Sequence, residues 1–506
     1  MRDFRGERYG LINFLDKIIE YVSPAAGARR KAYREMMRYY DAGEINRYNH
    51  RWVPMDMPDQ ENAEAGERTL IRSRCRWLER NSDLTNSILS AMVRNVVNTG
   101  IRPQARCANE ALNTKIEALW TEWTRPENCD ITGQMGFYEI QRMLIQRKTV
   151  DGEVLVKLTV NEKERFPLKL QIIRPDLLDD SLMTAPGTGR IVRGGIELDD
   201  YLRPVAYWIK KKSADGWETA GSERIPAKEI LHLWQKKHPD QIRGISDLAA
   251  IAHRVKDLDE YLKAENMAAF MAACYSIFIV KNNYGGVGVG NMAGQKSSLT
   301  DIEGKSVEKV RPGMIVRLAQ GEDIKAANPG RPASTASDIT ELYTRMIGSG
   351  VGLSYEMVSR DFNGSSYSAA RQGNLEDRRT FQPMQQWLVT HFCEPVYRAF
   401  LDTMYLSGAL DMPGYADQKA EYQKAEWIAP GWQSIDPEKE MQADVLAMKS
   451  GTLTLGQQCA GHGYDWRDQL DQMAKEKEYA ENLGLTLPIH TPEAVQAAES
   501  NHKEDE

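Results

Sequence analysis

The sequence predicts a predominantly helical α+β protein, and three observations indicate this class. Apolar residues recur at three-to-four-residue spacing before residue 150 and after residue 240, as in amphipathic helices. Between residues 151 and 234 the apolar residues instead alternate with polar ones, as in half-buried strands. At 506 residues the chain is too long for one ordinary core, so we expect two or more subdomains.

Composition and charge indicate an ordinary soluble chain and argue against tight binding of nucleic acid. Hydrophobic residues make up 42% of the chain and charged residues 27%, so the chain is expected to fold. The formal net charge is −7, whereas proteins that hold nucleic acid through ion pairs usually carry a positive balance. If DNA is a partner, we expect the contact to be loose or confined to local basic positions.

The six cysteines are widely scattered, and no Cys-x-x-Cys pair occurs. This spacing argues against a zinc site and a disulfide framework, and it fits a reducing cytoplasm best. The first ten residues are charged and lack the apolar core of a signal peptide. The longest apolar run, residues 267–280, has 14 residues, whereas a membrane helix needs about 20. We therefore expect this run to be buried, and we expect no membrane partner.

Two stretches near the start of the chain predict amphipathic helices rich in basic residues. Within residues 1–40, the basic residues form either a solvated helix face or an arm that contacts a partner or DNA. Residues 72–103 carry one apolar stripe, with Ser82 as a candidate N-cap and Gly100 as a stop signal. Four arginines in this stretch could suggest nucleic-acid binding, but their alternate spacing points them around a helix, which favours structural ion pairs. They are Arg72, Arg74, Arg76 and Arg80.

The middle of the chain predicts strands joined by hairpin turns. Strand-like alternation covers residues 154–160, 168–172 and 205–209, and residues 230–234 close the region. Gly194 and Gly195 mark one hairpin turn, and residues 214–216 mark another.

The polar residues of this region do not form a catalytic constellation. His232 stands alone on an apolar strand, which favours a structural role. Asp179 and Asp180 are adjacent in sequence, as are Asp199 and Asp200, so the two carboxylates of each pair would diverge on a strand.

A glycine-rich stretch, residues 284–298, is the one place where a nucleotide-hydrolysing enzyme could lie. A phosphate-binding loop needs glycine directly before its lysine, so that backbone N–H groups can surround the phosphates. Here Lys296 follows Gln295. A glycine loop without nucleotide chemistry is therefore favoured.

Residues 244–265 predict a helix with a narrow apolar stripe and a highly charged opposite side. This pattern suits packing against neighbouring copies in an assembly, and it equally suits an ordinary surface.

Residues 350–388 are dense in Ser, Tyr, Arg and Asp, yet no pair among them has the spacing of a catalytic device. Asn363 and Gly364 form a turn dipeptide, because both tolerate positive φ. The residues after it, up to Leu388, place apolar side chains among many charges and predict a long, partly exposed helix.

Three blocks, in this order, resemble the lambda-like family of phage portal proteins. Residues 72–103 hold Arg-Ser-Arg, Arg-Asn and Val-Val-x-x-Gly-Ile, although Asn98 stands where that family more often has glycine. Residues 350–400 hold Gly-Leu-Ser-Tyr-Glu, Asp-Phe and Tyr-Ser-Ala-Ala-Arg-x-Gly, followed by Glu and paired Arg. Residues 427–470 hold Ile-Asp-Pro-x-Lys-Glu, Gly-Thr-Leu-Thr and Gly-x-Asp.

The resemblance implies a portal fold with wing, stem, clip and crown regions, assembled as a ring of commonly twelve subunits around a channel. The implied regions are the wing at 1–244, with its β-rich part at 151–234; the stem and clip at 245–325; the tunnel loop and the start of a long helix at 326–345; the long helix and wing return at 346–410; and the crown and C-terminal tail at 411–506.

By the same resemblance, six residues around the presumed tunnel loop are candidates to line the channel, with an ordinary surface loop as the alternative for each. They are Lys325, Asn328, Arg331, Ser334, Ser337 and Glu341. We expect no catalytic, metal-binding or cofactor-binding residues.

The resemblance also implies partners and a location. Double-stranded DNA would pass through the channel, and the ring would contact the terminase large subunit, a head-completion or connector protein, and the major capsid and scaffold proteins. The protein would occupy the portal vertex of the virion after assembly in the host cytoplasm. The alternative from another class is a DNA-acting or nucleotide-hydrolysing enzyme of the packaging machinery, similar to terminase; a third possibility is a non-viral structural ring.

Overall fold

The computed structural model describes residues 60–212, 218–273, 277–281, 322–326, 336–363, 366–432, 437–462 and 464–485. The chain divides into two compact units, Met1–Asp59 and Gln60–Glu506, and the described residues all belong to the second. The predictions for residues 1–40, for the turn at 214–216 and for the glycine-rich stretch lie outside the described residues.

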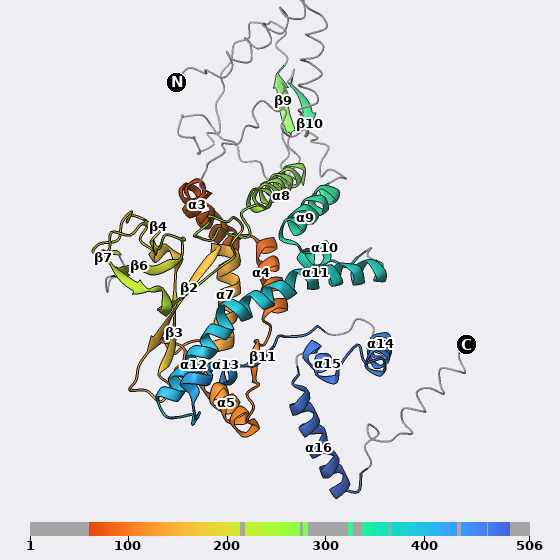
Figure 1. Ribbon diagram of the computed structural model, residues 1–506. Helices are drawn as coiled ribbons and strands as arrows, with labels where there is room; N and C mark the ends of the chain where they lie inside the picture. Colours follow the sequence, from red (N-terminus) through yellow and green to blue (C-terminus); the bar gives the residue numbers. More distant parts are fainter. Residues whose placement is uncertain are drawn as a thin grey trace, which may run out of the picture. The chain divides into compact units, whose positions relative to one another are not determined.

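Helices dominate the described residues, and the predicted α+β class is confirmed (Figure 1). The helices are α3 (Gln60–Asn81), α4 (Asp83–Val96), α5 (Glu110–Trp123), α6 (Pro126–Cys129), α7 (Phe137–Asp151), α8 (Ala252–Ala273), α9 (Ala336–Val351), α10 (Tyr355–Ser359), α11 (Tyr367–Leu388), α12 (Glu394–Leu406), α13 (Tyr415–Tyr422), α14 (Pro437–Lys449), α15 (Leu455–Gly461) and α16 (Trp466–Asn482).

The strands are antiparallel to their neighbours, and most of them lie in the region where alternation predicted them. They are β1 (Arg102–Ala105), β2 (Glu153–Val160), β3 (Leu168–Ile173), β4 (Val192–Arg193), β5 (Ile196–Leu198), β6 (Pro204–Lys212), β7 (Glu218–Pro226), β8 (Ile230–Trp234), β9 (Ile277–Lys281), β10 (Glu322–Ala326) and β11 (Ala425–Ile428).

Two sheets form in the β-rich region, and two further strand pairs lie outside it. The order is β3-β2-β8 in the three-stranded sheet and β4-β5-β6-β7 in the four-stranded sheet, while β1 pairs with β11 and β9 with β10. The predicted hairpin turn between β4 and β5 is confirmed, since Gly194 and Gly195 have φ of 53° and 80°. The β1–β11 pair joins the N-terminal helices to a segment more than three hundred residues later in the chain.

An aromatic cluster holds the main core together. The Trp120 ring lies 4.9 Å from Trp123, 5.0 Å from Phe137, 5.4 Å from Tyr397 and 5.2 Å from Phe400, measured between ring centroids. Its contacts with the last three are edge-to-face, the arrangement that the ring quadrupole favours. The cluster therefore fixes α5 and α7 against the much later α12.

The stretch predicted as one helical passage, residues 72–103, is two helices followed by a strand. Ser82 separates α3 from α4, and its Oγ accepts a hydrogen bond from the Thr85 N–H at 3.2 Å, so the predicted N-cap is confirmed. The helix ends at Val96, before Gly100, and Asn98 already has a positive φ of 45°. Asparagine tolerates this conformation better than most residues, which explains its place where the family more often has glycine.

The helix predicted from residue 244 is wrong at its start, because α8 begins at Ala252. Ser246 Oγ and the Asp247 N–H both donate to the Thr149 carbonyl at the end of α7, at 3.0 and 3.1 Å. The Leu248 N–H donates to Ser246 Oγ at 3.2 Å. These local hydrogen bonds replace the first helical turn, although Leu248 is buried as its place in the apolar stripe predicted.

The apolar run at residues 267–280 was expected to be buried, and this expectation is wrong for the side chains that the structure describes. Met267 is 61% exposed and Phe270 is 66% exposed on the last turns of α8. The second half of the run forms β9. Among the described helices, none combines the length and the apolar character that a membrane crossing requires.

The long helix predicted after Asn363 is confirmed as α11. Ser366 caps it, with Oγ accepting from the Ala369 N–H at 3.3 Å. A π-helical turn, Val389–Cys393, then carries the chain into α12. The two helices run one after the other, and α11 packs beside α4 (Figure 1).

Candidate functional site

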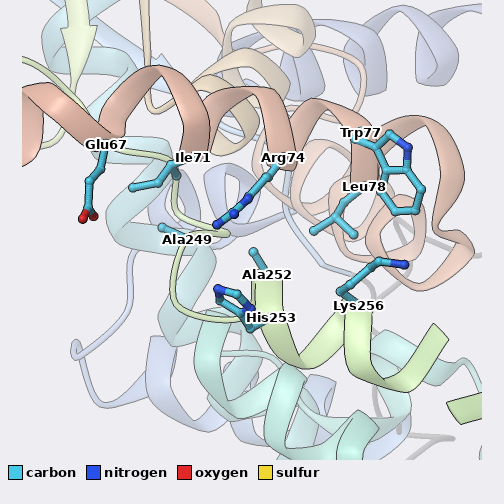
Figure 2. Close-up of a pocket in the computed structure, with 9 residues that line it drawn as sticks. All are labelled: Glu67, Ile71, Arg74, Trp77, Leu78, Ala249, Ala252, His253 and Lys256. Atoms are coloured by element: carbon cyan, nitrogen blue, oxygen red, sulfur yellow. The ribbon is translucent and has the colours of Figure 1, made fainter. Parts of the chain in front are cut away.

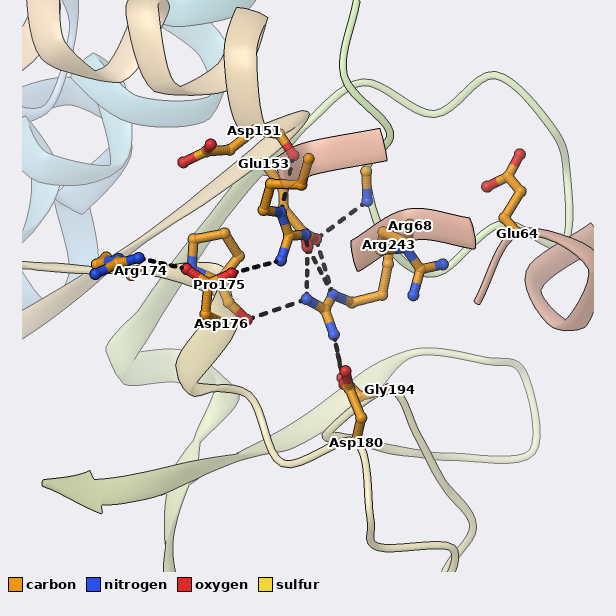
Figure 3. A network of polar contacts seen from close by, with 12 residues as sticks. Glu64, Arg68, Asp151, Glu153, Arg174, Pro175, Asp176, Asp180, Gly194 and Arg243 are labelled. Atoms are coloured by element: carbon orange, nitrogen blue, oxygen red, sulfur yellow. Dashed lines mark hydrogen bonds and ion pairs between the residues drawn. The ribbon is translucent and has the colours of Figure 1, made fainter. Parts of the chain in front are cut away.

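A buried carboxylate, Glu153, lies at the centre of a network of polar contacts (Figure 3). It is 0% exposed at the first position of β2. Arg72 of α3 donates to its Oε1 from Nη2 at 2.7 Å, and Arg243 does so from Nη2 at 2.6 Å. His232 of β8 lies with Nε2 3.0 Å from Oε2, and the Gly244 N–H donates to Oε2 at 3.1 Å. Residues from three separate segments thus meet at the carboxylate of a fourth, β2.

Arg243 extends this cluster into the second sheet. Its Nη1 donates to the Asp180 carboxylate at 2.9 Å and to the Gly194 carbonyl at 2.6 Å, and its Nη2 donates to the Pro175 carbonyl at 3.2 Å (Figure 3). One buried guanidinium therefore ties the β4–β5 hairpin and the loop after β3 to β2. The planar fork of arginine suits such a junction because it presents five donors in a fixed geometry.

Helix α3 is bound to the same region by two of its five arginines. Arg76 donates from Nε to Asp151 at 2.7 Å, and its Nη2 lies 2.9 Å from Asp176. Arg72 bonds to Glu153 and Asp176. The predicted structural ion pairs are thus confirmed for Arg72 and Arg76. Arg74 and Arg80 are exposed, and neither forms an ion pair with any residue that the structure describes.

The charges in the cluster have shifted proton affinities. Burial by itself would raise the pKa of the Glu153 carboxyl, but the charge of Arg243 and hydrogen bonds from His232 and Arg243 hold that pKa well below its usual value. Burial lowers the pKa of His232, and this outweighs its hydrogen bond to Glu153. His232 is therefore neutral at pH 7, with the proton on Nε2 facing the carboxylate.

This arrangement is structural rather than catalytic. The side chains of Glu153 and His232 are both buried, and each already has its partners inside the chain. The prediction of a structural role for His232 is confirmed, although the residue is not unaccompanied. Asp179 and Asp180 diverge as expected, since Asp179 binds Ser181 and Ser222 while Asp180 binds Arg243.

Two glycines allow the segments around the cluster to approach closely. Gly152 has φ of 86°, and a Cβ there would lie 2.3 Å from the Ile245 carbonyl carbon. A Cβ on Gly244 would lie 2.2 Å from the Gly152 oxygen. Each glycine directly adjoins a charged residue of the cluster, so the close backbone contact sets the distance between Glu153 and Arg243.

Residues 350–388, which carry part of the family resemblance, make close contacts that join several helices. A Cβ on Gly350 of α9 would lie 2.4 Å from Ile251 Cγ2, so the two elements touch directly. Ser354 caps α10, and its N–H and Oγ donate to the Asp377 carboxylate of α11 at 2.7 and 2.6 Å. Ser87 Oγ of α4 donates to the Val358 carbonyl at 2.7 Å. These serines hold helices together.

The structure places only some of the six candidate channel residues. Lys325 lies on β10, where it pairs with Phe278 of β9 in the strand register. Ser337 and Glu341 lie one turn apart on α9; Ser337 is exposed, and Glu341 pairs with Arg345. Asn328, Arg331 and Ser334 lie outside the described residues. A channel role for all six stays a prediction, as do the limits of the wing, stem, clip and crown.

Sequence reasoning missed Glu153 and Arg243, which are the most consequential polar residues of the described region. A signal was present: a carboxylate comes directly after glycine and directly before three apolar residues, and an arginine directly precedes another glycine. Nothing in the spacing, however, indicated that the two meet. Within the described residues, no group of three or more His, Cys, Asp or Glu side chains is arranged to hold a metal ion.

These contacts define a structural site, in which polar side chains join helices to sheets. The model of the phage portal proteins of the lambda family matches residues 46–385. The chain is 26% identical over 493 residues to a probable portal protein of Halomonas phage phiHAP-1, covering 95% of this chain and 93% of that one. It is 22% identical over 425 residues to portal protein B of Escherichia phage lambda, covering 78% and 79%.

Among solved structures, a chain from the virion of a native gene transfer agent particle aligns with a TM-score of 0.45 at 15% identity, covering 79% of this chain and 93% of that chain. The family match extends over more than half of the chain. The chain therefore belongs to the lambda family of phage portal proteins.

Proposed function

We propose that this portal protein assembles as a ring of about twelve subunits at one capsid vertex, and that double-stranded DNA enters and leaves the capsid through the ring. The observation that carries this proposal is the family match over residues 46–385. The charge of the chain supports it. A net charge of −7 per subunit disfavours nonspecific adhesion, because counterion release at each neutralised phosphate would otherwise hold DNA that must slide.

The partners follow from this role. The ring would receive the terminase large subunit during packaging and a head-completion or connector protein afterwards, and it would contact the major capsid and scaffold proteins around the vertex. Assembly would take place in the host cytoplasm, and the mature location would be the portal vertex of the virion.

The rival function is an enzyme of the packaging machinery, and the described polar residues favour the portal role over it. Such an enzyme needs a complete phosphate loop or a cluster of carboxylates open to solvent. The best acidic pair, Asp179 and Asp180, points to different partners, and Glu153 is covered by arginines. The portal role requires no such site, because the packaging motor would be a separate protein.

Lys325→Ala combined with Arg331→Ala is expected to reduce packaged or retained DNA on the order of tenfold while rings still assemble, since losing two phosphate contacts per subunit weakens the hold on DNA. DNA content of assembled particles and ring formation in electron micrographs would be measured together. Lys475→Ala with Lys477→Ala, two exposed positions on α16, is the matched control and should leave both unchanged. Loss of ring assembly in the first double variant would mean that its residues are structural instead.

A further inference from the structure

A groove between α3 and α8 has an apolar floor and a cationic rim (Figure 2). Its volume is about 510 Å³. Ile71 and Leu78 of α3 and Ala252 of α8 contribute apolar surface to its lining. Figure 2 shows Arg74 and Leu78 descending from α3 toward Ala252 and His253 on α8.

The rim carries two cations, Arg74 and Lys256, although the chain as a whole is acidic. Arg74 and His253 are exposed, and neither forms an ion pair with a residue that the structure describes. Lys256 lies over the Trp77 ring at 5.2 Å from the centroid, and Glu260 is 2.9 Å from its Nζ. Glu67 is the single carboxylate of the lining. A group that fits this groove should offer apolar side chains together with a carboxylate.

The outer face of α9 offers this combination. Asp338, Leu342 and Met346 recur every four residues and so lie on one side of the helix. Leu342 is 55% exposed and Met346 40% exposed. Asp338 is exposed as well, and it has no ion-pair partner within the described part of the chain. The face therefore carries a carboxylate, without an ion-pair partner among the described residues, in line with two exposed apolar side chains.

The groove and the α9 face lie on different flanks of the subunit. Helix α8 contacts α3 on one side and α9 on the other (Figure 1). Two different surfaces that match each other produce a heterologous, head-to-tail contact, and such contacts close into a ring when the rotation between subunits permits it. A twofold dimer through the groove would instead bring the two cationic rims together.

We propose that the groove between α3 and α8 receives the Asp338–Leu342–Met346 face of α9 from the next copy of this chain. This inference rests on the proposed ring and names one of the contacts between its subunits. Burial of Leu342 and Met346 would supply the apolar contact, and Asp338 facing Arg74 would set its register and direction.

Cross-linking between separately labelled copies tests the contact. Full-length Ala249→Cys and Leu342→Cys single variants, each in a background that also carries Cys274→Ser and Cys459→Ser, are mixed, allowed to assemble and treated with a short bis-maleimide. A covalent dimer that contains one copy of each variant is expected, and neither variant alone should give it. Mixing single variants ensures that the cross-link joins two chains. Its absence from assembled rings would overturn the inference.

A charge exchange provides the second readout. Arg74→Glu and Asp338→Arg are each expected to raise the protein concentration needed for half-assembly about tenfold, because each places like charges together, and the double variant should recover assembly. Arg80→Glu, at an exposed position on α3 outside the groove lining, is the matched control. Failure of the double variant to recover would count against the pairing.

The two proposals fail differently. If the wild-type chain forms no ring, the proposed function is wrong. If it forms rings that neither cross-link between these positions nor respond to the charge exchange, the ring stands and this contact is wrong.

Discussion

Glu153→Gln is expected to lower the free energy of unfolding by about 3–5 kcal/mol, which is typical for breaking a buried ion pair by removing one partner. Arg243 is fully buried, and Arg72 nearly so, and both point at the Glu153 carboxylate. A glutamine would leave two buried guanidinium groups facing a neutral amide whose N–H₂ cannot accept a hydrogen bond. The loss is measured as a shift of the denaturant midpoint relative to wild type.

Glu394→Gln is the matched control for this substitution. Glu394 accepts from Arg398 at 2.9 Å, but the pair spans one turn of α12 and its arginine is exposed. Such surface pairs contribute about 0.2–1 kcal/mol. A Glu153→Gln midpoint close to that of the control would contradict the account of the buried cluster.

The same carboxylate predicts how stability depends on pH. The folded-state pKa of Glu153 is depressed, so its contribution is fully present above the unfolded-state pKa of about 4.3 and is lost as the pH falls through the folded-state value. The pKa of His232 is also depressed, so stability begins to decline below its unfolded-state value of about 6.5. Glu153→Gln should therefore flatten the acid side of the stability profile below about pH 4.3.

Gly152→Ala is expected to destabilise the fold by about 2–5 kcal/mol, since it combines a strained positive φ with steric overlap. The φ of Gly152 is 86°, and the new Cβ would lie 2.3 Å from backbone atoms of Ile245, which cannot rotate away as a side chain could. The displacement would reach Glu153, the next residue. Thermal unfolding followed by circular dichroism measures the effect.

Gly66→Ala is a control that is expected to change stability in the opposite direction. Gly66 lies inside α3, and a Cβ there would meet nothing within 4 Å. Replacing glycine in an exposed helix interior should stabilise by about 0.5–1 kcal/mol. If both alanine variants shifted stability in the same direction, the close backbone contact at Gly152 would not explain why this position holds glycine.

Much of the local structure could be predicted from the sequence because its causes are local. Alternation in the middle of the chain identified β2, β3, β6 and β8. The Ser82 cap follows from a side-chain oxygen placed three residues before the amide it accepts from. Positive φ at Gly194 and Gly195 follows from the turn chemistry of glycine. Each of these features depends on a few consecutive residues.

The incorrect predictions concern features that depend on contacts between residues far apart in the sequence. The turn at Ser246 bonds to Thr149, almost a hundred residues earlier, and this displaced the predicted start of α8. Glu153 and Arg243 meet only through the tertiary fold. Met267 and Phe270 form part of an apolar run yet are exposed on α8, because hydrophobicity alone does not determine which residues the tertiary fold covers.

Electron microscopy of the purified full-length chain tests the central claim most directly. The account predicts ring-shaped particles of about twelve subunits around an open central channel. Single subunits, or closed particles without a channel, would contradict it.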